Sequence, residues 1–450
     1  MMPFQPVLLW SDLLLWLLIA AALLAARWAC HQPHLLAAWR RVGQSPVGMG
    51  SGTLLLVFLL IALLDSLHYR PLLPPTEAGA PARYTVETLS ALDALLAPLR
   101  TRPEKTYSAP LATLSFAKEA TADGLGRDYP RLQHGGAHLA DPATQHGKDL
   151  LVASVRGLAG GFALWVLCWL LLRPLSQNST LAWNGALIVL LAVCLLTGLL
   201  IALAQGYHPL GTDKVGQDVL YQSLKAIRTG MVIGLLTTLI MLPAAIVLGL
   251  MAGYFGGWID DVIQYLYTTL NSIPGVLLIA AAVLMMQVLI ETHPQWFATA
   301  AERADARLIA LCAILGITSW TGLCRLLRGE TLKLRELEYV QAARALGCSH
   351  ATILARHILP NVMHIVIIAL VMDFSSLVLA EAVLSYVGVG VDPTTISFGT
   401  MINAARMELA REPMVWWSLA AAFGFMFALV LAANLFADVV RDAFDPRLVR

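Results

Sequence analysis

The stretch YVQAARALGCSHATILARHILPN, residues 339–361, decides the fold of this chain, because it is a short polar segment within a very apolar sequence. The 450 residues are 58% hydrophobic and 13% charged, and their mean hydropathy is +0.70. Soluble domains carry about 25% charged residues, so this composition predicts a membrane protein. The formal net charge of +1 lacks the basic excess that is typical of nucleic-acid binding.

Apolar runs long enough to cross a bilayer recur along the chain. A helix needs about 20 such residues to span the hydrocarbon with its backbone groups paired internally. Nine runs meet this requirement, at about 8–28, 51–68, 154–173, 182–204, 229–252, 262–290, 308–324, 364–387 and 415–437. The sequence therefore predicts an all-α polytopic membrane protein with about nine spans, in which Pro243 and Pro274 kink two of the helices.

The distribution of Lys and Arg predicts the orientation of the spans, because cytoplasmic loops carry the excess of positive charge. No Lys or Arg precedes the first run, unlike in a cleaved signal peptide. With the N-terminus outside, the short cytoplasmic segments hold thirteen Lys and Arg residues and the opposite short loops hold seven. We therefore expect the N-terminus outside, the C-terminus in the cytoplasm, and residues 325–361 in the largest cytoplasmic loop.

The opening stretch predicts a helix, a turn and a second helix. Residues 332–346 form the first helix in this interpretation, because apolar residues recur there at helical spacing. Gly347 fits the position after a helix C-terminus, where a positive φ is needed. Ser349 suits the N-cap of a short second helix, and Pro360 suits its end or the start of the next span. We call residues 332–361 the elbow; an ordinary solvated loop is the alternative interpretation.

The elbow resembles the EAA loop of binding-protein-dependent ABC importer permeases. In that family the pattern is Glu-Ala-Ala, three residues, glycine, nine residues, and an apolar turn that ends in Leu-Pro. The matching positions are Gln341, Ala342, Ala343, Gly347, His357, Leu359 and Pro360. Gln341 departs from the family's usual glutamate.

Four further stretches resemble the oligopeptide, dipeptide and nickel branch of that family, in the same order along the chain. They are HPLGTDKVGQDVL (208–220), AGYFGGWID (252–260), EAVLSYVGVGV (381–391) and DVVRDAFDPRL (438–448). Gln217 stands where the branch usually has Arg. The resemblance covers about residues 205–450 and implies the second, C-type permease subunit, with a type I ABC importer permease core.

The resemblance implies that the elbow couples transport to ATP by docking into a groove on a cytoplasmic ATPase subunit. Such a helix buries an apolar face in the groove, and Arg344 is expected at its rim. The implied partners are a second permease subunit that completes a heterodimer, two ABC ATPase subunits, and a periplasmic or lipid-anchored substrate-binding protein. The implied location is the lipid bilayer of a bacterial inner membrane, and no nucleic-acid partner is expected.

The chain itself contains no GxxxxGK[ST] phosphate-binding loop. We therefore expect no ATPase activity, no catalytic residue and no cofactor in this chain, with ATP and Mg²⁺ bound by the partner ATPases. The six cysteines do not show metal-ligand spacing, and no metal site is assigned to them.

Asp373, Ser376 and Glu381 lie in the run 364–387 and are candidates for the translocation path. Ionisable groups at membrane depth are costly and usually face a cavity or a partner. Asp373 and Glu381 are separated by about 80° around a helix, so both can border one surface. Hydrogen bonding between helices is the alternative interpretation.

Gly211, Thr212, Asp213 and Asp218 precede a span on the outer side. The sequence predicts a turn and then an amphipathic interfacial helix within 207–228. By resemblance this segment lies at the outer mouth, where a substrate-binding protein docks, so the four residues are candidates for that contact.

The runs and the resemblance together divide the chain. Three spans, about 8–28, 154–173 and 182–204, are additions to a minimal permease. The predicted divisions are N-terminal spans 1–69, a periplasmic insert 70–150, additional spans 151–206, the outer interfacial helix 207–228, a permease core 229–438 with the coupling loop 325–361, and a cytoplasmic tail 439–450.

The insert is rich in Pro, Gly and Ala, and its sequence predicts one helix, at 85–100. His134, His138 and His146 prompt a metal-site hypothesis. The Gly-Gly pair between the first two weakens the helix that would bring them together, so solvated loop histidines are the preferred interpretation.

Two other protein classes are alternatives to an importer. A secondary transporter would show inverted repeats, and an intramembrane enzyme would need a nucleophile–base pair or a metal set within the spans. The sequence shows neither pattern. Within the importer interpretation the substrate stays open among peptides or related small solutes, nickel or another metal chelate, and antimicrobial peptides.

Overall fold

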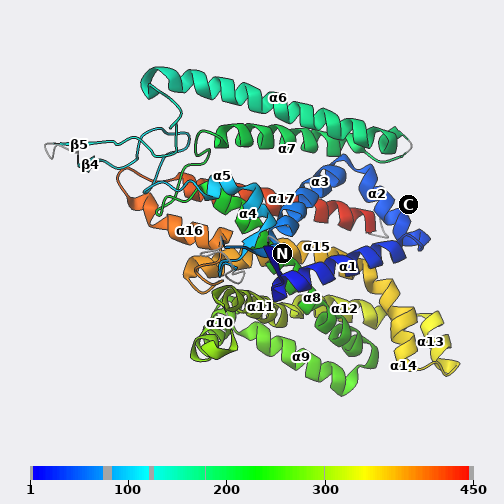
Figure 1. The fold of residues 1–450 in the computed structure, drawn as a ribbon. Helices are drawn as coiled ribbons and strands as arrows, with labels where there is room; N and C mark the ends of the chain where they lie inside the picture. Colours follow the sequence, from blue (N-terminus) through cyan, green and yellow to red (C-terminus); the bar gives the residue numbers. More distant parts are fainter. Residues whose placement is uncertain (1–3, 74–83, 121–125, 178, 298, 445–450) are drawn as a thin grey trace, which may run out of the picture. The chain divides into compact units, whose positions relative to one another are not determined.

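The computed structural model describes residues 4–73, 84–120, 126–177, 179–297 and 299–444. Within these ranges, nine helices are long and apolar enough to cross a membrane, which confirms the predicted all-α polytopic fold (Figure 1). The chain divides into two compact units. Unit 1 comprises Met1–Leu8, Arg40–Met231 and Pro393–Leu435, and unit 2 comprises Leu9–Trp39, Val232–Asp392 and Phe436–Arg450.

Unit 1 contains the insert, the added spans α6 and α7, and both small sheets. Its helices are α3 (Pro46–Asp65), α4 (Ala91–Leu95), α5 (Ala97–Arg100), α6 (Pro142–Gln177), α7 (Trp183–Ala204), the beginning of α8 (Val219–Phe255), α16 (Phe398–Arg406), the 3-10 helix η3 (Glu408–Ala410) and most of α17 (Trp417–Phe444). Its strands are β1 (Phe4–Val7), β2 (His68–Pro71), β3 (Leu89–Ser90), β4 (Glu119–Ala120) and β5 (Arg127–Asp128).

The strands of unit 1 are short and antiparallel. β2 lies between β1 and β3, with Val7 opposite His68 and His68 opposite Ser90. β4 and β5 form a separate hairpin, in which Glu119 lies opposite Asp128. The sheet therefore ties the N-terminal strand to the first part of the insert.

The added spans α6 and α7 pack with their backbones in close approach (Figure 1). A Cβ atom on Gly157 would lie 2.7 Å from the carbonyl oxygen of Gly198, and one on Gly161 would lie 2.4 Å from that of Cys194. Side chains do not fit at such separations. Small residues four positions apart let membrane helices approach in this way, and this explains why the two spans form a pair.

Unit 2 contains the long helices that carry the elbow. Its helices are α1 (Trp10–Ala29), the first part of α2 (Pro33–Gln44), the remainder of α8, α9 (Gly257–Ser272), α10 (Gly275–Thr292), the 3-10 helix η1 (Pro294–Trp296), α11 (Ala300–Ser319), α12 (Thr321–Leu334), α13 (Glu338–Ala345), α14 (His350–Ile353), the π-helix η2 (Leu354–Ile358), α15 (Leu359–Val387) and the end of α17.

Two contacts place helices within unit 2. Gly249 and Gly253 of α8 lie against α12, where a Cβ on Gly253 would come within 2.6 Å of Cβ of Thr331. At the start of α1, the backbone N–H of Ser11 donates to Asp305 of α11 over 3.1 Å, and the hydroxyl of Ser11 donates to the same carboxylate. Ser11 and Asp305 are both buried, so the added span α1 is packed into this unit.

Three predicted helices differ from the observed ones. The run 262–290 is broken, because Ile273 adopts an extended conformation before Pro274, which separates α9 from α10. Conversely, α8 is one helix from Val219 through Pro243 to Phe255, so the predicted interfacial helix is its first part, with no helix end at 228. Residues of α8 on both sides of 228, such as Ile227 and Val232, are buried, so the helix continues into the bundle.

The predicted insert helix 85–100 is also wrong in its first part. The hydroxyl of Ser90 caps a helix that begins at Ala91, and Asp93 returns a hydrogen bond to the backbone of Ser90. A second short helix then starts with Pro98 in its first turn. The capping box and the proline set both boundaries.

Candidate functional site

The elbow is a helix, a glycine turn and a second helix, as predicted, but its first helix starts later. α12 extends to Leu334, and a turn separates it from α13, which begins at Glu338 rather than at 332. The backbone N–H groups of Arg335 and Glu336 bond to Thr331 and Lys333 and close this turn. The elbow is therefore joined to α12 by two residues of turn and one bend.

Gly347 ends α13 in a left-handed conformation, with φ of +77°. The backbone N–H of Cys348 bonds to the carbonyl of Ala343 over 3.1 Å, and that of Gly347 bonds to Arg344 over 3.1 Å. This is the pattern of a glycine C-cap, so the predicted role of Gly347 in the turn is present. The side chain of Ser349 then caps α14 by accepting from the backbone of Thr352, also as predicted.

Pro360 does not end the second helix. The chain is helical without interruption from His350 to Val387, and residues Leu354–Ile358 form a π-helical turn within it. Proline lacks the N–H that would bond to Arg356 and crowds that carbonyl. A wider turn immediately before the proline accommodates this defect. α15 begins at Leu359 with Pro360 in its first turn, so the second predicted alternative, the start of the next span, is the one observed.

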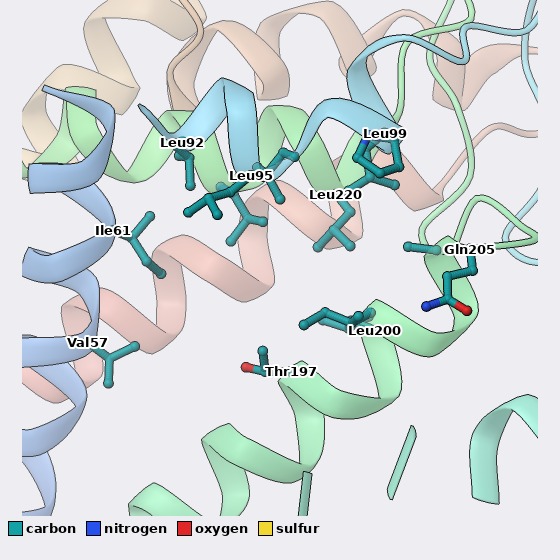
Figure 2. A pocket seen from close by; sticks show the side chains of 14 residues that line it. Val57, Ile61, Leu92, Leu95, Leu99, Thr197, Leu200, Gln205 and Leu220 are labelled. Carbon is teal, nitrogen blue, oxygen red and sulfur yellow. The ribbon is translucent and has the colours of Figure 1, made fainter. Parts of the chain in front are cut away.

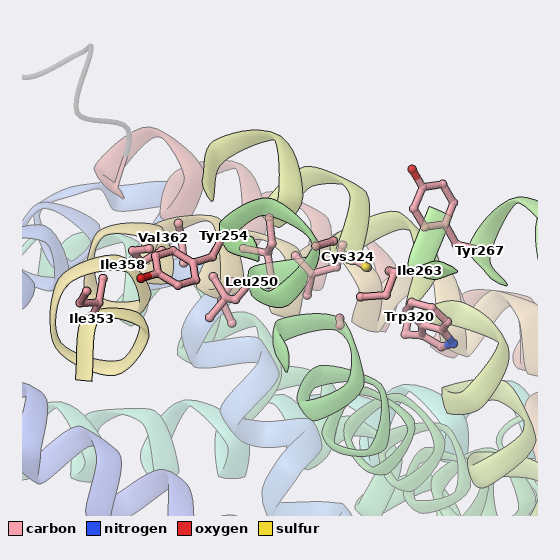
Figure 3. Close-up of a cluster of buried hydrophobic side chains, with 14 of the residues drawn as sticks. Leu250, Tyr254, Ile263, Tyr267, Trp320, Cys324, Ile353, Ile358 and Val362 are labelled. Atoms are coloured by element: carbon pink, nitrogen blue, oxygen red, sulfur yellow. The ribbon is translucent and has the colours of Figure 1, made fainter. Parts of the chain in front are cut away.

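The inner side of the elbow is part of a buried apolar cluster (Figure 3). Val340 and Ala343 of α13 are buried, as are Ile353 and Ile358 beyond the turn. Figure 3 shows Ile353, Ile358 and Val362 near Tyr254 of α8. Ala343 therefore packs within this chain.

The outer side of the elbow exposes apolar surface. Leu346 is 84% exposed at the end of α13, and Leu337 and Tyr339 are 44% and 42% exposed. Ala342 and Arg344 are exposed on the same helix. We call Leu337, Tyr339, Ala342, Arg344 and Leu346 the elbow face.

Polar contacts hold the elbow in place on the rest of unit 2. The hydroxyl of Tyr254 lies 2.8 Å from Nδ1 of His350, and Nη1 of Arg335 donates to the carbonyl of Gly253 over 3.3 Å. Nδ2 of Asn361 donates to the hydroxyl of Tyr339 over 3.1 Å. These bonds join both halves of the elbow to α8 and α15.

Gln341 and His357 have local roles in this arrangement. Nε2 of Gln341 donates to the carbonyl of Glu336 over 3.1 Å, so the amide closes the turn before α13. The carbonyl of His357 accepts from Nδ2 of Asn361 over 2.6 Å, beside the π-helical turn. A glutamate at 341 could not donate the first of these bonds.

A charge pair connects α12 with α9. Nε and Nη2 of Arg328 lie 2.5 and 2.7 Å from the two carboxylate oxygens of Asp260. These hydrogen bonds from Arg328 are the main cause that lowers the pKa of the Asp260 carboxyl. The sequence alone did not indicate this pair, although Asp260 lies inside the stretch AGYFGGWID.

The three candidates for the translocation path lie in different surroundings on α15. Glu381 is buried and accepts a hydrogen bond from the hydroxyl of Ser385 over 2.6 Å. Ser376 is exposed, and its hydroxyl donates to the carbonyl of Asp373, whose side chain is half-buried. Glu381 thus has an internal partner, and the transport role of all three residues stays a prediction.

The predicted binding-protein contact is not at the surface. Gly211, Thr212 and Asp218 are buried, and only Asp213 of the four candidates is partly exposed. The hydroxyl of Thr212 donates to the carbonyl of Thr106 over 2.9 Å. The insert covers Gly211, Thr212 and Asp218, so Thr212 and Asp218 do not offer their side chains to a docking protein.

A buried histidine fixes the insert to this segment. Nδ1 of His208 lies 2.8 Å from Oδ2 of Asp218, and its Nε2 lies 3.5 Å from Oε1 of Glu104. Burial alone would lower the pKa of His208, but the two carboxylates raise it to about 9. We call His208, Asp218 and Glu104 the insert clasp.

Glu104 also organises the insert itself. Its carboxylate accepts backbone N–H groups of Gln133, His134 and Gly135 over 2.7 to 2.9 Å. Burial alone would raise the pKa of Glu104, but His208 and these N–H groups lower it to about 2. One carboxylate thus links two distant parts of the insert to the segment before α8.

The histidines of the insert have other partners. Nε2 of His138 lies 2.8 Å from Oδ2 of Asp149, which also accepts from the hydroxyl of Tyr207. In the part of the chain that the structure describes, no group of three His, Cys, Asp or Glu residues is arranged to hold a metal ion.

Comparisons with known proteins agree with this architecture. Residues 245–450 match the family model described as binding-protein-dependent transport system inner membrane component. The oligopeptide transport system permease protein OppC of Mycobacterium tuberculosis is 33% identical over 239 residues, which cover 53% of this chain and 76% of that protein. The glutathione transport system permease protein GsiD of Pectobacterium atrosepticum is 34% identical over 243 residues, covering 54% and 73%.

The match covers a smaller share of a third relative. The dipeptide transport system permease protein DppC of Lactococcus lactis is 30% identical over 237 residues, covering 53% of this chain and 63% of that protein. A helical membrane bundle with this elbow and these relatives is a permease subunit of a binding-protein-dependent ABC importer. The chain belongs to the family of binding-protein-dependent transport system inner membrane components, which confirms the predicted resemblance.

Family membership also sets the coarse biology. The chain is a multi-pass inner-membrane protein that works with other transporter subunits. The family assignment replaces the hypotheses of a secondary transporter and of an intramembrane enzyme. The segment DVVRDAFDPRL lies partly beyond the described residues, which end at 444, and so does half of the predicted tail 439–450.

Proposed function

We propose that this permease docks an ATPase subunit on the elbow face and converts ATP-driven movement of that subunit into transport. The exposure of Leu346 carries this proposal. A leucine that is 84% exposed at the tip of a polar helix buries little of its side chain within the chain, and it can fill a pocket on a partner. Arg344, which is exposed on the same helix, is the proposed contact at the rim of such a pocket.

The construction of the elbow suits the transmission of force. Val340, Ala343 and Ile353 bury its inner side, while Tyr254 bonds to His350 across the turn. Close packing resists deformation, so a displacement of the elbow face moves α8 and α15 with it. A loosely attached loop would absorb the same displacement.

The proposed complex contains a second permease subunit, two ABC ATPases and an external substrate-binding protein. ATP and Mg²⁺ would be held by the ATPases, with no cofactor or ATPase activity in this chain, and the N-terminus would lie outside. Peptides are the proposed substrate class, supported by relatives named as oligopeptide, dipeptide and glutathione permeases. Uptake of a nickel or metal chelate, or of an antimicrobial peptide, by the same machinery is the second candidate.

The docking proposal is tested at Leu346 in the assembled importer. Leu346→Asp should reduce recovery of the ATPase subunits with the tagged permease by at least about tenfold, because the lost burial of one leucine is worth about 1.5–3 kcal/mol. Leu346→Met is the matched control, since it keeps an apolar side chain of similar volume. Equal recovery of ATPases with both variants would contradict docking on the elbow face.

A further inference from the structure

An apolar pocket lies within unit 1, between membrane helices and the insert (Figure 2). Its volume is about 410 Å³. Val57 and Ile61 of α3 form one wall, Leu200 of α7 forms another, and Leu92 and Leu95 of α4 cover it. Figure 2 shows these side chains directed into a common space, with Leu220 of α8 on the far side.

The lining excludes a polar occupant. Of the fourteen residues around the pocket, only Thr197 and Gln205 have polar side chains. An apolar cavity of this size does not hold ordered water, because water needs two to four polar partners. The volume falls within the range of ligand pockets, about 300–1,000 Å³.

The pocket is open toward its surroundings. Leu95 of α4 is 66% exposed, and Ile201 of α7 is 59% exposed. Ile201 belongs to a span, so the solvent on that side is the hydrocarbon of the bilayer. The molecules that can enter from there are the acyl chains of lipids.

Positive charge lies at one end of the pocket. Nη1 of Arg102 donates to the carbonyl of Gln205 over 2.9 Å, and Nη2 of Arg156 donates to the side-chain oxygen of Gln205 over 2.8 Å. Both arginines are exposed. A guanidinium has five N–H donors, so each retains donors for a phosphate. Gln205 ends α7, where the headgroups of one leaflet are expected.

We propose that this pocket binds one acyl chain of an anionic phospholipid, whose phosphate is held by Arg102 and Arg156. The lipid fills a dry cavity between α3, α7 and the insert, and thereby joins the added span α7 to the beginning of α8. Its role is structural, and it is separate from docking at the elbow face.

The test uses the full importer reconstituted with phosphatidylglycerol that carries a photoreactive group in one acyl chain. Labelling should concentrate on Leu95 and Leu200, above the level at Leu196 of α7, which is 55% exposed outside the pocket. Excess unlabelled phosphatidylglycerol should reduce the pocket labelling in preference to that at Leu196. Glycerol phosphate should not compete, because it lacks the acyl chain.

Two kinds of variant sharpen the result. Leu200→Trp fills the pocket and should lower the labelling about tenfold, the change expected when two methylene groups lose their contacts, while Leu196→Trp should not. Arg102→Gln with Arg156→Gln should remove the preference for phosphatidylglycerol over phosphatidylcholine. Equal labelling of Leu200 and Leu196 in the native chain, without preferential competition, would overturn the proposal even where a variant fails to insert.

Discussion

Nδ1 of His208 lies 2.8 Å from Oδ2 of Asp218, and both side chains are almost completely buried. Asp218 at the same time accepts the backbone N–H of Leu220 over 2.8 Å and so caps the beginning of α8. The insert clasp therefore fixes the insert at the point where α8 begins. The stretch HPLGTDKVGQDVL has a structural role here, under the insert.

The insert clasp predicts a pH dependence for the attachment of the insert. The pKa of His208 is raised to about 9 from its usual 6.5, so its stabilisation is fully present below pH 6.5 and is lost as the pH rises through 9. The pKa of Glu104 is lowered to about 2 from 4.5, so its contribution is present above pH 4.5 and is lost as the pH falls through 2. Cleavage of the insert by added protease should accelerate between about pH 7 and about pH 10.

His208→Gln should remove the alkaline part of this dependence and make the insert sensitive to protease at neutral pH. His138→Gln is the matched control, because its pair with Asp149 is 46% and 33% exposed and such pairs contribute little. If the native insert is cleaved equally fast at all these pH values, His208 does not stabilise the attachment through its charge.

The ion pairs of Lys225 predict a loss of stability where the insert meets α8 when this lysine is replaced. Its Nζ lies 2.6 Å from Oδ1 of Asp65 and 3.1 Å from Oδ2 of Asp93, and the two aspartates are 3% and 5% exposed. Lys225→Met leaves both buried carboxylates without their cation and should destabilise this junction by about 3–5 kcal/mol. A fall in the thermal unfolding midpoint and faster cleavage near Ser90 would measure it.

The triple variant Lys225→Met, Asp65→Asn and Asp93→Asn is the control for this prediction. It removes the two negative charges together with the positive one, so much of the lost stability should return. A triple variant no more stable than Lys225→Met would show that packing of the lysine stem, and not its charge, matters.

The sequence predicted the parts of this fold that depend on local physics. Span positions follow from apolar length, and the turn at Gly347 and the cap at Ser349 follow from backbone requirements that only a few residue types meet. The effect of proline on its preceding residue is also local, but a kink was expected at Pro274 and the structure shows a break between α9 and α10.

The parts that the sequence did not predict depend on distant segments. Thr212 and Asp218 precede a span and suggested an exposed mouth, but Thr106 and Glu104 cover them from about a hundred residues earlier. The exposure of Leu346 was also not predicted, because Leu346 follows the buried Val340 and Ala343 at the same three-residue spacing. Its position next to Gly347 is the signal that places it at the helix tip.

The packing of α8 on α12 predicts a further sensitive position. A Cβ on Gly253 would lie 2.6 Å from Cβ of Thr331 and 2.7 Å from the carbonyl of Arg328. Gly253→Ala should therefore separate the two helices and cost about 1–3 kcal/mol by overpacking. Gly424→Ala in α17, where nothing lies within 4 Å of the added Cβ, should have no such effect on thermal stability. Equal midpoints for the two variants would contradict the close approach at Gly253.

The turn at Gly347 gives the sharpest separation between folding and coupling. A Cβ at Gly347 would meet no atom within 4 Å, so any cost of substitution comes from its φ of +77° and not from a clash. Gly347→Val should strain the turn by about 1–2 kcal/mol and shift α13 relative to α14, whereas Gly347→Asn accepts a left-handed conformation more readily. In the reconstituted importer we expect the valine variant to hydrolyse ATP with little uptake of substrate, and the asparagine variant to retain most of its coupling. Fully coupled transport by the valine variant would mean that the angle of the elbow does not transmit force.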